Sequence, residues 1–255
     1  FIKILVLIKL IFNNNITILI LVIKIITFLL PLAVLFLPSL WVNYILKKNN
    51  STLSDMPFTG KELGEKILSE YQLNNVSINP IKQLDHYNPK DKKIHISNDK
   101  LNKKSITSIS VVAHEIGHAI QDKENYKPLQ IRQNLIKKTE IFQRIGSIFL
   151  IIGLPSIFAI TKSPIITLIA AIFIMGCLST NVLIHLITLP VEFDASFKKA
   201  LPILKKYVPK ENMKQCKSVL RAAAFTYLAQ SIISIFRLKI ILLSFINIFK
   251  SMIRR

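Results

Sequence analysis

The sequence predicts a mostly helical α+β membrane protein, in which a small helix–sheet–helix domain is combined with about three to five transmembrane helices. Three observations predict this fold class. All 14 acidic residues fall in the windows 47–144 and 190–221. The windows 1–46, 145–189 and 222–255 carry no carboxylate and are strongly apolar, as lipid-facing segments are. Within 47–144, the hydrophobic spacing changes from helical to short strand-like runs and back to helical.

The first window, residues 1–46, is predicted to hold one or more N-terminal transmembrane segments. Residues 25–46 are 22 positions without a charge, which is about the length that a helix needs to cross a bilayer. Pro31 and Pro38 are expected to kink this helix, as membrane helices tolerate. The sequence leaves open whether residues 1–24 make a further crossing.

The second window, residues 47–144, is predicted to be a compact polar domain. Thr59-Gly60-Lys61-Glu62 is a capping-box pattern that precedes a helix. A second helix is expected from about Ser105, because apolar residues return there at helical spacing. Between the two helices we expect three short strands, at Val76–Ile78, around Asp85–Tyr87 and at Lys93–Ser97.

The remaining windows return to apolar sequence with one polar interruption. Residues 145–189 hold a single charge, Lys162, and are predicted to form a transmembrane helical hairpin. Residues 190–221 are predicted to be a polar segment that ends in a basic loop. Residues 222–255 are predicted to form a C-terminal transmembrane or membrane-associated helix.

His114-Glu115-Ile116-Gly117-His118 lies on the second predicted helix of the polar domain and has the H-E-x-x-H pattern. Residues four apart lie about 40° apart around a helix, so both imidazoles can reach one metal ion. Neutral imidazole suits zinc, and Glu115 is placed beside the metal as the general base. A catalytic residue at Glu115 and zinc ligands at His114 and His118 are therefore expected, in a zincin-like catalytic domain.

A catalytic zinc ion usually has three protein ligands and a water molecule, so a third ligand is expected. Glu192 is the preferred candidate. Two predicted membrane crossings separate it from His118, and an even number of crossings returns the chain to the same side of the membrane. Glu124 and Asp122 are the alternatives. Glu124 would need a sharp turn that glycine favours, and Gln121 stands at that position. Asp122 would compete with the water.

Three further residues are candidates for supporting roles. Asp194 is expected to orient a ligand histidine by hydrogen bonding, with a solvated surface carboxylate as the alternative. For His86 and Tyr87 a plain structural role is favoured, and the alternative is that they border the cleft on an edge strand and stabilise an oxyanion. His185 lies two helical turns before Glu192, so we expect it to pack rather than to bind metal.

The formal net charge of +20 raises the question of nucleic-acid binding. We expect no nucleic-acid partner, since no groove-reading motif accompanies the charge. Basic residues beside transmembrane segments instead favour contacts with anionic lipids. The windows 47–144 and 190–221 hold 17 and 8 Lys or Arg residues, whereas the loop on the other side of the membrane holds Lys162 alone. The positive-inside rule therefore places the catalytic side in the cytoplasm.

Blocks along residues 57–236 resemble a known family. They are Thr59-Gly60, Asp85-His86-Tyr87, Val112 to Gln121, Tyr126 to Leu129, Leu189 to Ser196 and Val219 to Ala224. Together they are similar to the YugP-type membrane zinc metallopeptidases, also called neutral zinc metallopeptidases. The resemblance implies a membrane-bound zinc peptidase with ligands at His114 and His118 and a base at Glu115. More distantly, the chain is similar to HtpX-type and CAAX prenyl membrane proteases, in which an Asp follows the ligand Glu by four residues; here that position is Ser196.

We therefore predict a multi-pass membrane zinc metalloendopeptidase that hydrolyses peptide bonds with a metal-activated water. Its expected partners are peptide or protein substrates, membrane proteins among them, and anionic lipids. The alternative is a non-enzymatic membrane scaffold or lipid-binding protein with a structural zinc site. A structural site would hold four protein ligands and no exchangeable water.

Overall fold

The computed structural model describes residues 2–82 and 84–253, so the outer ends of the predicted segments 1–46 and 222–255 lie outside the described residues. Most of the chain is helical, and one small sheet makes it α+β as predicted. The elements are α1 (Ile2–Lys48), α2 (Gly60–Glu70), β1 (Ser77–Ile81), β2 (His86–Asn88), β3 (Lys93–Ser97), α3 (Asn98–Leu101), α4 (Ile106–Lys123), α5 (Lys127–Ile148), η1 (Phe149–Gly153), α6 (Leu154–Thr161), α7 (Pro164–Phe193), η2 (Asp194–Ala200), α8 (Leu201–Tyr207), η3 (Lys210–Asn212) and α9 (Met213–Ile253).

The chain divides into two compact units, with the boundary between Leu40 and Trp41. The first unit consists of most of α1, which bends by 45° between Ile18–Leu30 and Leu32–Lys48. The bend falls at Pro31, where proline has no N–H for the helical hydrogen bond, and this confirms the predicted kink there. The second unit contains every other element.

The polar domain of the second unit is built as its local sequence signals predict. Thr59 and Glu62 form a complete capping box at the start of α2, with Glu62 N donating to Thr59 Oγ1 at 3.2 Å. The three strands form a sheet of order β1-β3-β2, in which β1 runs parallel and β2 antiparallel to β3. Strand β2 is therefore an edge strand, as predicted.

Helix α4 is the centre of the hydrophobic core. Ser105 caps it by accepting a hydrogen bond from Ser108 N, and every residue from Ile106 to Gln121 is buried. Apolar side chains of α2, β3, α8 and α9 pack around it; the largest fully buried ones are Leu63, Ile67, Ile94, Ile96, Leu204 and Leu220. This burial holds α4 rigidly, which suits a helix that carries a reactive motif.

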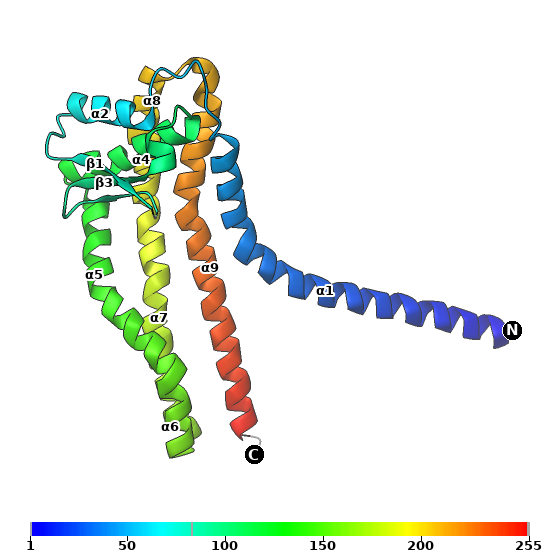
Figure 1. The fold of residues 1–255 in the computed structure, drawn as a ribbon. Helices are drawn as coiled ribbons and strands as arrows, with labels where there is room; N and C mark the ends of the chain where they lie inside the picture. The colour runs from blue at the N-terminus through cyan, green and yellow to red at the C-terminus, as the bar shows by residue number, and fades with distance from the viewer. Residues whose placement is uncertain (1, 83, 254–255) are drawn as a thin grey trace. The chain divides into compact units, whose positions relative to one another are not determined.

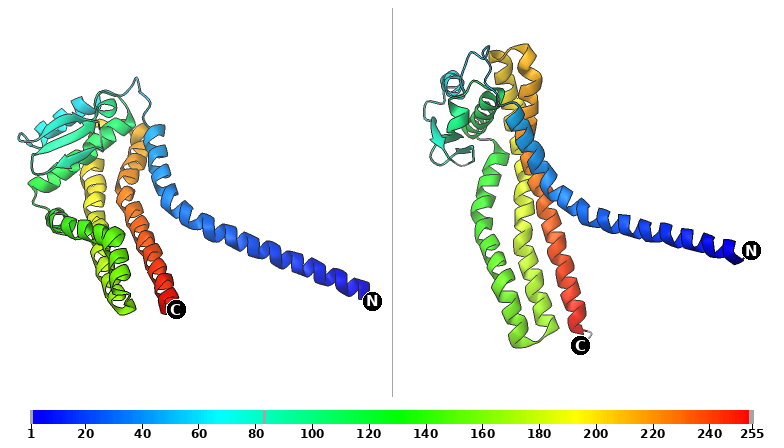
Figure 2. Two further views of the ribbon diagram at one scale, coloured as in Figure 1. Left: turned by 60° about the horizontal axis from the view of Figure 1, so that its bottom comes forward. Right: turned by 45° about the vertical axis from the view of Figure 1, so that its right-hand side comes forward.

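Three helical stretches of the described residues are long and apolar enough to cross a membrane, namely Lys127–Thr161, Pro164–Tyr207 and Lys210–Asn247. The bent halves of α1 would make a fourth if they count as one span. In Figures 1 and 2, α5–α6, α7 and α9 run side by side, and α2, α4 and the sheet lie together at one end of them. Ile151 and Ile160 on this bundle are 73% and 81% exposed, as expected of side chains that face lipid.

The prediction of a basic loop within 190–221 is wrong, because most of this stretch is helical. Residues 194–207 are helical through η2 and α8, and α9 begins at Met213. The lysine pairs of this stretch face outward, whereas Ala200, Ile203 and Leu204 are buried against the core. The amphipathic spacing of those apolar residues therefore determines the local structure.

Candidate metal centre

The two histidines of the H-E-x-x-H motif lie on one face of α4, one turn apart. Their ring centroids are 4.8 Å apart, and both side chains are buried. The hydrogen bonds of α4 and its packing on all sides fix the backbone from which they project.

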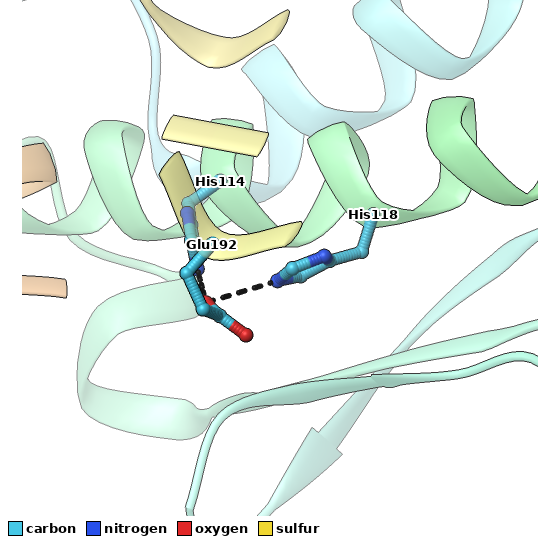
Figure 3. A group of neighbouring side chains, drawn as sticks. All are labelled: His114, His118 and Glu192. Carbon is cyan, nitrogen blue, oxygen red and sulfur yellow. Dashed lines mark ion pairs between the residues drawn. The ribbon is translucent and has the colours of Figure 1, made fainter. Parts of the chain in front are cut away.

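Figure 3 shows the carboxylate of Glu192, near the end of α7, beside both rings. Its Oε2 atom lies 3.2 Å from His114 Nε2 and 3.4 Å from His118 Nε2, and only 1% of the residue is exposed. Two ligand atoms that each lie 2.0–2.1 Å from a tetrahedral zinc ion are about 3.3 Å apart. The separations between the carboxylate oxygen and the two imidazole nitrogens therefore match a tetrahedral zinc site.

The second nitrogen of each imidazole has its own partner, which leaves both Nε2 atoms for the metal. His118 Nδ1 lies 3.0 Å from Gln121 Oε1, an atom that can only accept, so Nδ1 carries the proton of the neutral ring. His114 Nδ1 lies 3.0 Å from the hydroxyl of Ser196. With Nδ1 protonated, each Nε2 lone pair is available as a ligand.

Asp194 acts on the same network through Gln121. Gln121 Nε2 donates to Asp194 Oδ2 at 2.9 Å and to the Val191 carbonyl at 2.8 Å. Because both acceptors fix the amide orientation, the oxygen of Gln121 faces His118. Asp194 is 6% exposed, so it is a buried carboxylate and not a solvated one.

The helix α4 and the segment η2 approach each other closely at Gly117. A Cβ atom at this position would lie 2.7 Å from the carbonyl oxygen of Ala195, closer than side-chain carbons approach in folded proteins. The glycine within the motif therefore permits the contact that brings Glu192, Asp194 and Ser196 to α4.

Glu115 is buried beside this cluster. Burial raises the pKa of its carboxyl group to about 7; the His114 imidazole opposes this shift, and the charge of Glu192 adds to it. The backbone of Tyr87 on the edge strand acts in the opposite direction and lowers the pKa of Glu115. A carboxyl group with a pKa near neutrality can both take up and release a proton at physiological pH.

Comparison with known proteins agrees with this geometry. The family model described as "Putative neutral zinc metallopeptidase" matches residues 4–246. The chain belongs to this family. It is also 28% identical over 220 residues to a Bacillus subtilis (strain 168) protein named "Putative membrane protease YugP", across 82% of this chain and 92% of that protein. No solved structure gives a significant match.

Family membership makes zinc the cofactor, and the donor set of the cluster fits that ion. His114, His118 and Glu192 are the one group of three or more metal-ligating side chains among the described residues, with ligand atoms all within 4.8 Å of one another. Two imidazole nitrogens and a carboxylate oxygen are a common protein ligand set for catalytic zinc.

The other residues predicted for the site lie outside the three-residue cluster. The hydroxyl of Tyr87 donates to Asp122 Oδ2 at 2.6 Å, so the side chains of both residues are engaged away from the histidines. His86 is exposed and stacks on His95 with a centroid distance of 4.8 Å. Glu124 caps the end of α4 and pairs with Lys199.

Sequence reasoning did not identify Gln121 and Ser196 as partners of the histidines. A signal was present for each. Gln121 follows His118 by three residues, so it shares a helix face with that histidine. Ser196 follows Glu192 by four residues, a spacing that places both on one helix face, and its hydroxyl lies 3.0 Å from His114 Nδ1.

Proposed function

We propose that this protein is a multi-pass membrane endopeptidase, in which zinc is held by His114, His118 and Glu192 and Glu115 is the general base. The observation that carries the proposal is the convergence of three buried ligand atoms from α4 and α7, with nitrogen–oxygen separations of 3.2 and 3.4 Å. Three protein ligands leave a fourth position of a tetrahedral zinc ion open, as catalysis requires.

Different residues of the chain have different roles in the proposed hydrolysis. When bound, zinc lowers the pKa of a water molecule and polarises the peptide carbonyl. Glu115 takes a proton from the attacking water and later passes it to the amine nitrogen as the C–N bond breaks. Gln121 holds the His118 imidazole in the tautomer that leaves Nε2 unprotonated, and the Ser196 hydroxyl fixes the orientation of the His114 ring through Nδ1. Burial of the cluster limits competing water.

Two substitutions and one control test the proposal in the purified full-length protein. Glu115→Gln should keep one zinc ion per chain and lose proteolysis of a casein-type substrate. Glu192→Ala should lose the zinc ion. Glu124→Gln, which alters an exposed carboxylate outside the cluster, should behave as the wild type. Full activity in Glu115→Gln would refute the role of the base.

The same experiment separates an enzyme from a scaffold with structural zinc. A scaffold would bind zinc in the wild type without any proteolysis that a chelator abolishes. A structural site would also have a fourth protein ligand, and the cluster holds three among the residues that the structure describes. The peptidase proposal predicts that proteolysis disappears on chelation and returns with added zinc.

We further propose that the catalytic end faces the cytoplasm and that the substrates are peptides or proteins, including membrane proteins. The Lys and Arg residues of 47–144 and 190–221 support this orientation through the positive-inside rule, and they suit contacts with anionic lipids. The turn around Lys162 would then lie outside. A cysteine placed at Lys162 should react with an impermeant thiol reagent on intact cells, and labelling only after lysis would contradict this orientation.

A further inference from the structure

The two oxygens of the Glu192 carboxylate have different surroundings. Oε2 is the atom that faces both imidazoles, at 3.2 and 3.4 Å. Oε1 is buried and hydrogen-bonds to none of the described residues, but it lies 3.6 Å from Nη1 of Arg132 on α5. One oxygen is thus directed to the metal position and the other to a guanidinium group.

Arg132 is held in place by an aromatic residue from a third helix. Its Nη2 donates to the hydroxyl of Tyr227 on α9 at 3.3 Å, and the guanidinium carbon lies 5.4 Å from the centre of that ring. The Arg132 side chain is 19% exposed, so its charge is largely shielded from water. A planar guanidinium that stacks on a ring and donates to its hydroxyl has a restricted orientation.

We propose that Arg132 is a positioning residue that keeps Oε1 away from the metal, so that Glu192 binds zinc through Oε2 alone. The inference rests on the proposed function. A carboxylate that bound through both oxygens would add a fifth ligand atom beside the two imidazoles and the reacting water, and would crowd that water. The charge of the guanidinium favours Oε1 where it is and opposes rotation of that oxygen toward the cation.

The alternative is that Arg132 only neutralises a buried carboxylate or fills space between the helices. Either role would be satisfied without any effect on how Glu192 binds the metal. The coordination number of the metal therefore distinguishes positioning from packing, whereas loss of activity alone does not.

The test replaces zinc by cobalt(II) in the full-length protein in detergent micelles and records the visible spectrum, which differs between four- and five-coordinate cobalt. Arg132→Gln should shift the spectrum toward five-coordination, and in the zinc enzyme it should lower kcat about tenfold or more with little change in KM. Arg132→Lys keeps the charge but not the planar group, so it should shift the cobalt spectrum less than Arg132→Gln does. Tyr227→Phe removes the hydroxyl that orients Arg132, and it should shift the cobalt spectrum in the same direction.

The matched control is Arg144→Gln on the same helix, because Arg144 pairs with Glu140 and is 75% exposed. Its spectrum and kcat should equal those of the wild type. A wild-type spectrum in folded Arg132→Gln would overturn the proposal; if that variant does not fold, wild-type spectra in both Arg132→Lys and Tyr227→Phe would overturn it. Wild-type protein that binds cobalt but never cleaves peptides would refute the proposed function, while the spectra would still decide the role of Arg132.

Discussion

The contact between Gly117 and Ala195 gives the sharpest test of how the metal centre is assembled. In Gly117→Ala the new methyl group would lie 2.7 Å from the Ala195 carbonyl oxygen, whereas ordinary van der Waals contact begins at 3.4 Å. The atom that must move is backbone, so η2 must shift from α4 by about 0.7 Å in that direction. A shift of this size would lengthen the hydrogen bonds of Ser196 and Asp194, which now measure 3.0 and 2.9 Å.

Two free-energy terms set the expected effect of Gly117→Ala on folding. Overpacking a core costs about 1–3 kcal/mol, and replacing a helical glycine by alanine returns about 1 kcal/mol. The change in the free energy of unfolding is therefore small. The effect on metal binding is larger, because loss of outer hydrogen bonds to zinc ligands typically weakens metal affinity about 10- to 100-fold.

The assay is zinc competition against a chromophoric chelator, with thermal unfolding measured in parallel. Gly176→Ala is the matched control, since a Cβ atom there would meet nothing within 4 Å. We expect Gly176→Ala to bind zinc as the wild type does and Gly117→Ala to bind it at least about tenfold more weakly. Equal zinc affinity in the two variants would refute the reasoning.

Three further predictions follow from named contacts. Gln121→Ala should weaken zinc binding by about tenfold or more in the same competition assay, because His118 Nδ1 loses its acceptor. Zinc at 100 times its Kd should raise the free energy of unfolding by about 2.7 kcal/mol, and Glu192→Ala should abolish this rise in thermal unfolding. Thr59→Ala should cost about 1 kcal/mol of stability at neutral pH without changing zinc affinity. The capping box lowers the pKa of Glu62, so the difference between Thr59→Ala and wild type should shrink as the pH falls through that lowered value.

The parts of the fold that local sequence determines were predictable. The capping box at Thr59, the strand at Lys93–Ser97 and the buried helix after Ser105 all appear where periodicity and turn residues place them. These signals involve residues a few positions apart. The helical structure of 194–207 was missed because its charged residues suggested a solvated loop, while burial of Ile203 and Leu204 depends on contacts with distant elements.

The same distinction between local and distant contacts applies to the metal centre. The convergence of Glu192 with the histidines could be predicted, because the parity of the membrane crossings constrains which end of the protein it reaches. Arg132 carried no such signal. Its neighbours Glu192 and Tyr227 lie on other helices, and the packing of three helices brings the three residues together. Hydrophobic periodicity does not encode the register between helices, so sequence reasoning could not find this group.

Four residues of the segment from Val191 to Ser196 contact α4 through polar atoms. Residues two apart lie about 200° apart around a helix axis, so Asp194 meets α4 through the long side chain of Gln121 and not beside Glu192. The chain changes to π-helical hydrogen bonding at Asp194, which widens the turn. Glu192 then faces the imidazoles, Asp194 reaches Gln121 and Ser196 reaches His114. The close approach that Gly117 permits lets this one short segment supply a metal ligand and both supporting hydrogen-bond partners.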